Sequence, residues 1–166
     1  MRLSQVLANP SGAFILDSEN RKVIAVLGSN AEIHKRMLIT AAAVRDLSAE
    51  ITAMSREEWL NFAPTLRERL QTIIGPFNAW RISTGFKLSA EAWQRMGPML
   101  RDAQGRLIGM IESMTQPVEV FRLLIAAPTL VHELDQIVLE LAKHSELSPM
   151  LIEGLRTRLQ ALRSLV

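Results

Sequence analysis

The chain alternates between short apolar runs separated by polar turns and long stretches whose apolar residues are spaced three and four apart. Residues 14–27 hold two short apolar runs around a turn, and Asp17 and Asn20 suit that turn because their side chains bond nearby backbone groups. After Gly28, one apolar helix face continues for about six turns. The pattern predicts a β-hairpin followed by a long helix. Its apolar positions are Ile33, Met37, Ala41, Val44, Leu47, Ile51 and Met54.

The same order of features returns in the second half of the chain. Asp102 stands where Asp17 stood, and Gly105 takes the place of Asn20 in the turn. We interpret this as an internal duplication; the alternative is a chance similarity between two amphipathic units. In the second helix Leu123, Leu124, Ile125, Ala127, Leu130 and Ile137 match Met37, Leu38, Ile39, Ala41, Val44 and Ile51, and the repeat-like units span residues 14–54 and 99–143.

A helical connector, residues 55–97, separates the two units. Ser55 followed by Glu58 is a capping box, in which each residue satisfies a free amide of the other at the start of a helix. The rest of the connector is expected to comprise a second helix ending at Gly75-Pro76, an irregular stretch over residues 76–88 and a short capped helix over residues 89–96.

Two prolines shape the expected helices of the C-terminal half. Pro149 follows the potential cap Ser148, at the first turn where its missing amide costs nothing, and predicts a C-terminal helix over residues 148–166. Pro128 lies inside the helix expected over residues 117–143, where proline removes a backbone hydrogen bond. Because the helical spacing of apolar residues continues across it, we expect a kink there and not a break. The kink is interpreted as tolerated strain, which alanine at this position would relieve.

Composition and the apolar pattern together indicate the fold class and a soluble protein. The 166 residues, 48% apolar and 22% charged, suit a single globular domain spanning residues 1–166, as a monomer or a homodimer. The hairpins at 14–27 and 99–111, each followed by a long helix, indicate an α+β fold that is predominantly α-helical. The longest uncharged apolar run, residues 123–130, is far short of the roughly 20 residues of a membrane span. We therefore expect a soluble, cytoplasmic protein that does not bind membranes.

The chain offers little chemistry for catalysis. There are no cysteines, and His34, His132 and His144 have neither the spacing nor the neighbours of a zinc site, so we expect surface histidines. Phosphate-loop and nucleophile-elbow patterns are absent. We predict a protein that is not an enzyme, with no catalytic residue, no metal and no cofactor.

The aromatic residues of the connector are the unusual feature. The chain's three tryptophans all lie between the two units and are accompanied by cations, a combination enriched at binding hot spots. The same residues could stack nucleobases or fill the core between two helical halves. The candidate partner-binding residues are Trp80, Arg81, Phe86, Lys87, Trp93 and Arg95.

The repeated unit resembles a known group of proteins. A hairpin of the form Asp-x-x-Gly-x-x-Ile-Ala followed by a helix Asn-Ala-x-x-Leu-Ile-Ala-Ala-Ala-Pro-x-Leu-Leu is typical of small, mostly uncharacterised bacteriophage and prophage accessory proteins. The first copy offers Asn30-Ala31 and Leu38-Ile39-Thr40-Ala41-Ala42-Ala43, and lacks the proline. The second offers Leu124-Ile125-Ala126-Ala127-Pro128, and lacks the Asn-Ala start and one alanine. The resemblance covers about half of the chain.

This resemblance implies a function by binding. A phage accessory protein of this type would act in the cytoplasm of the bacterial host, where it would modulate or inhibit a host protein such as an immune-system component. The alternative is a nucleic-acid-binding regulator, although 19 basic and 17 acidic residues are interleaved along the chain and form no basic stripe.

Overall fold

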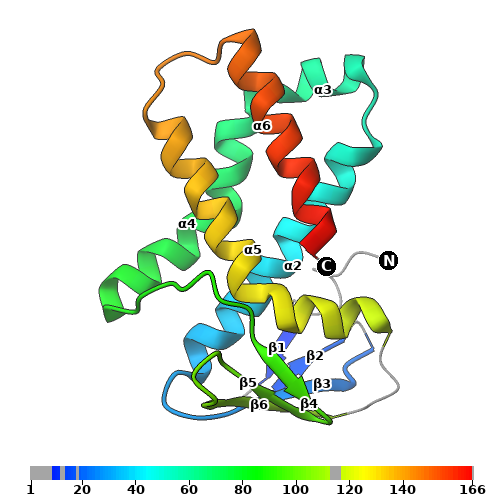
Figure 1. The fold of residues 1–166 in the computed structure, drawn as a ribbon, viewed down its shortest axis with the longest axis vertical. Helices are drawn as coiled ribbons and strands as arrows, with labels where there is room; N and C mark the ends of the chain where they lie inside the picture. The colour runs from blue at the N-terminus through cyan, green and yellow to red at the C-terminus, as the bar shows by residue number, and fades with distance from the viewer. Residues whose placement is uncertain (1–8, 12–13, 18, 113–116, 166) are drawn as a thin grey trace.

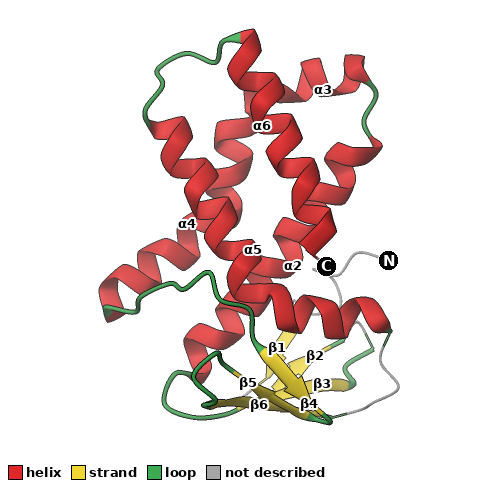
Figure 2. Ribbon diagram, viewed as in Figure 1, coloured by secondary structure: helices red, strands yellow, loops and turns green. Residues whose placement is uncertain are grey.

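A computed structural model describes residues 9–11, 14–17, 19–112 and 117–165. A β-sheet forms one end of the molecule and a group of helices stands on one face of it (Figures 1 and 2). The strands are β1 (Asn9–Ser11), β2 (Phe14–Leu16), β3 (Lys22–Val26), β4 (Gln94–Met96), β5 (Met99–Arg101) and β6 (Leu107–Ile111). The helices are α2 (Ala31–Ala53), α3 (Arg56–Phe62), the 3-10 turn η1 (Ala63–Thr65), α4 (Leu66–Thr84), α5 (Val118–Ala142), α6 (Pro149–Ala161) and η2 (Leu162–Leu165).

The sheet has the strand order β1-β2-β3-β6-β5-β4, and all its neighbouring strands are antiparallel. Strands β1, β2 and β3 of the first half thus occupy positions equivalent to those of β4, β5 and β6 in the second. The two predicted hairpins, β2–β3 and β5–β6, are joined edge to edge through β3 and β6. An isolated two-stranded hairpin is marginally stable in water, and joining two of them supplies the partner that each needs. The predicted α+β fold, mostly helical and with a long helix after each hairpin, is confirmed.

The two hairpins share one register. Phe14 faces Ala25 in the first hairpin, and Met99 faces Met110 in the second, so each counterpart lies 85 positions later. The register shifts after Ile15 in one hairpin and after its counterpart Leu100 in the other. The pairing of β3 with β6 is centred on Ala25 and Met110, which are themselves counterparts. The sheet therefore has approximate two-fold symmetry, as the duplication interpretation requires.

The two turns are built alike. The side-chain oxygen Oδ1 of Asp17 accepts hydrogen bonds from the backbone amides of Glu19 and Arg21, as that of Asp102 does from Gln104 and Arg106. The turn residues Asn20 and Gly105 both have positive φ, 62° and 82°. Asparagine and glycine are the residues that most easily adopt this conformation.

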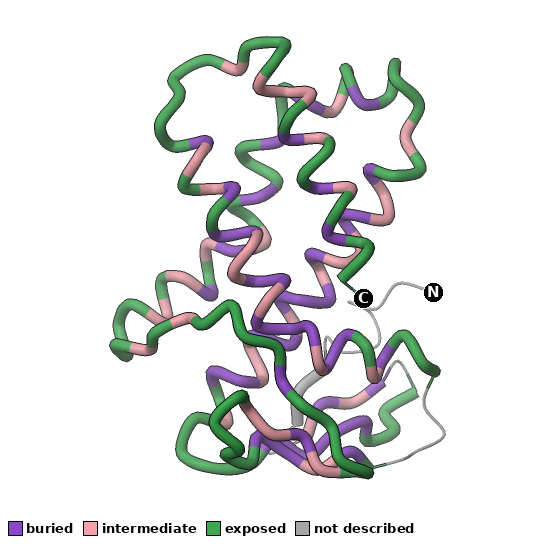
Figure 3. The backbone as a smooth tube through the Cα atoms, in the orientation of Figure 1, coloured by how far each residue is buried: buried purple, intermediate pink, exposed green. Residues whose placement is uncertain are grey.

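Helices α2 and α5 pack against each other and over the sheet (Figure 3). Their buried positions also correspond, now at a spacing of 86, as in Leu38 and Leu124 or Ala41 and Ala127. All four of these residues are fully buried, and the small alanines allow the helix backbones to approach closely. The buried apolar residues form one cluster that spans both halves of the chain.

Two helices contain an internal proline. Helix α5 bends in Figure 1, and Pro128 lies inside it, in agreement with the predicted kink. Helix α4 also continues through Pro76 to Thr84, so the prediction that it ends at Gly75-Pro76 is wrong. The buried residues Ile74 and Phe77 flank Pro76, and their common packing on the core keeps the chain helical across it.

The remainder of the connector is extended. The predicted helix over residues 89–96 is wrong, because residues 85–93 are irregular and residues 94–96 form β4. Backbone bonds to other elements override the local helical signal: the Trp93 amide donates to the Ile125 carbonyl at 2.9 Å, and β4 pairs with β5. The capping box of Ser55 and Glu58 at the start of α3 is present as predicted.

The C-terminal helix closes the helical layer. Ser148 caps α6 and Pro149 occupies its first turn, as predicted. The hydroxyl of Ser48 on α2 donates to the Leu159 carbonyl at 2.6 Å, and Arg156 donates to the Met54 carbonyl at 3.1 Å. None of the described helices is long and apolar enough to cross a membrane.

Candidate functional site

The six candidate partner-binding residues fall in three places. Phe86, Lys87 and Trp93 border a cavity of about 320 Å³. Trp80 and Arg81 lie on the last turns of α4, and Arg95 lies on the edge strand β4. Trp93 is buried, which corrects its assignment to an exposed binding face, while Lys87 and Arg95 are exposed and the other three are half-buried.

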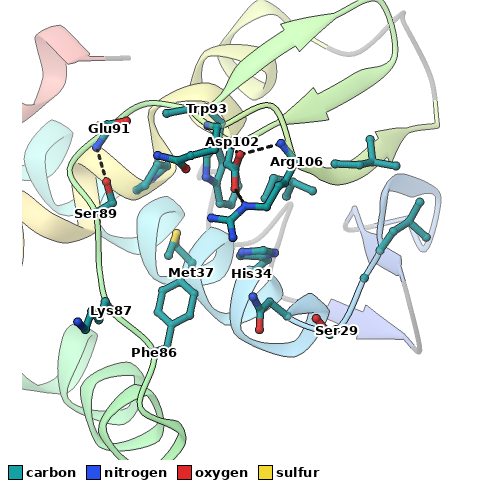
Figure 4. Close-up of a pocket in the computed structure, with 18 residues that line it drawn as sticks. Ser29, His34, Met37, Phe86, Lys87, Ser89, Glu91, Trp93, Asp102 and Arg106 are labelled. Carbon is teal, nitrogen blue, oxygen red and sulfur yellow. Dashed lines mark hydrogen bonds and ion pairs between the residues drawn. The ribbon is translucent and has the colours of Figure 1, made fainter.

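The cavity lies where three segments meet (Figure 4). The N-terminal end of α2 provides one wall, the turn of the β5–β6 hairpin provides the second, and the extended connector closes the third. Apolar lining comes from Met37, Phe86 and Trp93, whereas Ser29 and His34 add polar groups. A cavity of this size is at the small end of ligand sites in proteins, and nine of its 18 lining residues are polar or charged.

His34 is the most unusual group in this cavity. Its side chain makes edge-to-face contacts with Phe86 and Trp93, with ring centroids 6.1 and 5.4 Å away. The residue is only 9% exposed, so the expectation of a surface histidine is wrong. Its buried Nδ1 has no hydrogen-bond partner among the described residues. Burial lowers the pKa of His34 to about 4, with a smaller opposing effect from Asp102 and a small lowering from Arg106.

Asp102 and Arg106 form the wall opposite Phe86. Arg106 Nε donates to Asp102 Oδ2 at 2.8 Å, and in Figure 4 the Arg106 side chain extends over His34. Burial would raise the pKa of Asp102, but hydrogen bonds from Arg106 and Gln104 and the charge of Arg106 outweigh it and lower that pKa. Asp102 is thus fully engaged in its own turn, and the terminal nitrogens of Arg106 have no partner among the described residues.

A second surface feature lies beside Trp80. The Arg36 guanidinium on α2 lies 4.9 Å from the centre of the half-buried Trp80 ring. Arg36 also borders a groove of about 410 Å³ between α2 and α4, which we call the α2–α4 groove. Its floor includes Ile39, Ile73 and Phe77. Hydrogen bonds from Lys35 and Arg36, opposed by partial burial, lower the pKa of Glu32 at its rim.

Arg81 and Arg95 are engaged within the fold. Arg81 donates to Asn78 at 2.7 Å and to the buried Asp135 on α5 at 3.3 Å, and Asn78 donates to the other oxygen of Asp135. Arg95 lies 4.8 Å above the Phe121 ring and donates to the Gly97 carbonyl. Arg81 therefore joins α4 to α5, and Arg95 covers the edge of the sheet.

Sequence reasoning missed the central residue of the cavity and the partner of Trp80. At the spacing of 86 that relates the two helices, His34 corresponds to the buried Val120. Alignment of the two repeat units would therefore have marked His34, because it is a polar residue at a position that is apolar in the other unit. Arg36 gave no signal, because only the fold brings it to Trp80. No group of three or more possible metal ligands occurs within the described ranges.

Comparison with known proteins gives no relative: no protein-family model matches the chain, and no curated protein or solved structure matches it.

Proposed function

We propose that this chain is a non-enzymatic binding protein that docks a partner protein over the α2–α4 groove and Trp80. The observation that carries the proposal is the contact between Arg36 and Trp80 beside an apolar groove. A half-buried tryptophan held in place by a cation is pre-organised, and anchors of this kind dominate binding energies when they enter a partner's pocket.

The make-up of the groove supports a protein partner. Ile39, Ile73 and Phe77 offer apolar area at its floor, while Glu32, Lys35 and Arg36 place both signs of charge at its rim. An apolar centre with a polar rim is the usual composition of a protein interface. With the resemblance to phage accessory proteins, the partner would be a host protein in the bacterial cytoplasm, for example an immune-system component.

The alternative is a nucleic-acid-binding regulator. Trp80 with Arg36 could stack a base, as aromatic and arginine side chains do on single strands. Glu32 pairs with both rim cations, Lys35 and Arg36, so the rim carries one net positive charge and not the basic stripe typical of nucleic-acid binders, which disfavours this alternative.

Site-specific photo-cross-linking in bacterial lysate tests the proposal. The photoreactive residue p-benzoylphenylalanine is placed at position 43 in the groove and, as a control, at position 150, where Met150 is 86% exposed on α6. We expect position 43 to capture a protein that position 150 does not, and the capture to survive nuclease and raised salt. Equal capture at both positions, or loss on nuclease treatment, would refute a protein partner at the groove.

A further inference from the structure

We propose that the cavity around His34 binds a small organic anion, a carboxylate or phosphate group carried on an aromatic or heteroaromatic ring. This site is separate from the α2–α4 groove and goes beyond the partner binding proposed above. Three observations carry it: a buried histidine nitrogen without a partner, an arginine with free terminal nitrogens, and an aromatic wall.

The unpartnered nitrogen points to a ligand. A buried polar atom without a hydrogen bond costs about 1–3 kcal/mol. The described residues include four such side-chain atoms, His34 Nδ1, Arg45 Nε, Trp59 Nε1 and Arg156 Nε, and of these four residues only His34 lines the cavity. The second half of the chain has Val120 at the corresponding position, fully buried, and this shows that an apolar residue suits the fold there. His34 is therefore more than the fold requires, and contact between its ring and a ligand in the cavity would compensate for its burial.

The free guanidinium nitrogens of Arg106 also have an internal comparison. In the first turn Arg21 bonds Asp17 through Nε, as Arg106 bonds Asp102, but its Nη2 is paired with Glu19 at 3.3 Å. The residue corresponding to Glu19 in the second turn is the neutral Gln104. The turn beside the cavity thus keeps the arginine and lacks the carboxylate that would neutralise its outer nitrogens.

The cavity lining holds two cations, Lys87 and Arg106, and two carboxylates, Asp102 and Glu91, so the placement of the charges and not their sum favours an anion. Lys87 is exposed at the mouth of the cavity, and the described residues include no ion-pair partner for it. Asp102 is neutralised by Arg106, which leaves Glu91 as the only lining carboxylate without a cationic partner among those residues. The cavity also lies at the N-terminal end of the 23-residue helix α2, where the helix dipole favours negative charge.

The apolar lining favours a planar ring as the uncharged part of the ligand. Phe86 and Trp93 meet His34 edge to face, and Met37 and Pro128 add apolar contacts. A planar ring would lie against this wall while its anionic group reaches Arg106. A volume near 320 Å³ limits the occupant to about the size of one aromatic acid or one mononucleotide.

Isothermal titration calorimetry with four probes tests the inference. The probes are 4-hydroxybenzoate, adenosine 5′-monophosphate, adenosine and inorganic phosphate, each titrated to millimolar concentration. We expect one of the two anionic ring compounds to bind, and which one binds identifies the source of the anion. Adenosine and phosphate alone should bind at least roughly tenfold more weakly, because each lacks half of the required chemistry.

Three variants assign the binding to this cavity. Arg106→Gln and His34→Val should each weaken the bound probe by at least roughly tenfold. Arg21→Gln makes the same change in the equivalent turn of the first hairpin and should leave affinity unchanged, as should Trp80→Ala beside the α2–α4 groove. The inference is overturned if neither anionic probe binds, if adenosine binds as tightly as its monophosphate, or if Arg21→Gln weakens binding as much as Arg106→Gln.

Discussion

At the scale of single residues, the two halves of the chain serve as controls for one another. His34 and Val120 occupy corresponding buried positions, and Glu19 and Gln104 occupy corresponding turn positions. Where counterparts share a chemical character, the fold explains the residue. Where they differ in charge or polarity, a requirement specific to one half is the better explanation, and both of these differences border the same cavity.

The burial of His34 predicts a pH dependence of stability. Its pKa is about 4 in the folded protein and near the ordinary 6.5 in the unfolded chain. Between these values only the unfolded chain binds the proton, so the free energy of unfolding should be highest above pH 6.5 and should fall as the pH drops toward 4. The full difference corresponds to about 3 kcal/mol.

Urea denaturation at a series of pH values measures this dependence, and His34→Val is its control. Asp102, whose pKa is lowered below its ordinary 3.8, contributes only at more acidic pH. The free energy of unfolding of His34→Val should not change with pH between pH 5 and about 6.5. At pH 7 it should lie within about 1 kcal/mol of the wild-type value, because the loss of the aromatic contacts offsets the removal of the unsatisfied nitrogen. A slope that persists in the variant would assign it to another group.

Arg81 is predicted to stabilise the fold. Arg81→Ala would remove the cation from Asp135, which is 8% exposed, and leave only Asn78 to satisfy it. We expect the free energy of unfolding to fall by about 2 kcal/mol. Chemical denaturation measures this loss. Asp135→Asn, made alone and together with Arg81→Ala, completes a double-mutant cycle, and zero coupling energy would show that the pair does not contribute.

At the scale of elements, the kink at Pro128 has a packing role that the tolerated-strain interpretation lacks. In the turn before the proline, the carbonyl of Ile125 accepts the amide of Trp93 and so anchors the connector. We therefore expect Pro128→Ala to straighten α5 and to lower the free energy of unfolding by about 1–2 kcal/mol.

Pro76→Ala is the matched control for this change. Pro76 also lies inside a helix, but it is exposed, so replacing it should leave stability unchanged or raise it. Both variants are compared with the wild type by thermal and urea denaturation. An increase in stability for Pro128→Ala as well would restore the interpretation of the kink as tolerated strain.

The junction of β3 and β6 predicts a strict requirement for glycine at position 109. A Cβ atom built there would lie very close to the backbone carbonyl oxygen of Ala25 on the neighbouring strand. Gly109→Ala should therefore cost about 2–3 kcal/mol, measured by urea denaturation. Gly154→Ala on the exposed face of α6, where nothing lies within 4 Å, should be neutral or stabilise by up to about 1 kcal/mol. Equal effects would contradict the packing seen at the junction.

The sequence was informative where structure is local and uninformative where contacts are distant. Both hairpins, the helices after them and the caps at Ser55 and Ser148 follow from apolar spacing and turn residues. The helix predicted over residues 89–96 failed because its backbone bonds go to Ile125 of α5, which lies far along the chain, and to the neighbouring strand β5. The sequence did not predict the cavity for a related reason: α2, the β5–β6 turn and the connector are separate in sequence and meet only in the fold.

At the scale of the whole molecule, a sheet with approximate two-fold symmetry underlies two different proposed sites. Each hairpin supplies the strand that the other needs, and α2 and α5 cover the same face of the sheet. The connector breaks the symmetry: α4 packs on α2 to form the α2–α4 groove, and residues 86–93 run past the N-terminal end of α2 to close the cavity. The two hairpin–helix units would thus act as a scaffold, and the connector completes the surfaces proposed to bind.

Trp80, beside the α2–α4 groove, is proposed to anchor a partner and to be dispensable for folding. The direct measurement is the dissociation constant of the cross-linked partner, once purified, for the wild type and Trp80→Ala, with Leu60→Ala on the exposed face of α3 as the control. We predict that Trp80→Ala weakens binding by roughly 1–4 kcal/mol with little change in melting temperature, while Leu60→Ala does neither. Unchanged affinity for Trp80→Ala, or a loss of binding that accompanies unfolding, would contradict the account.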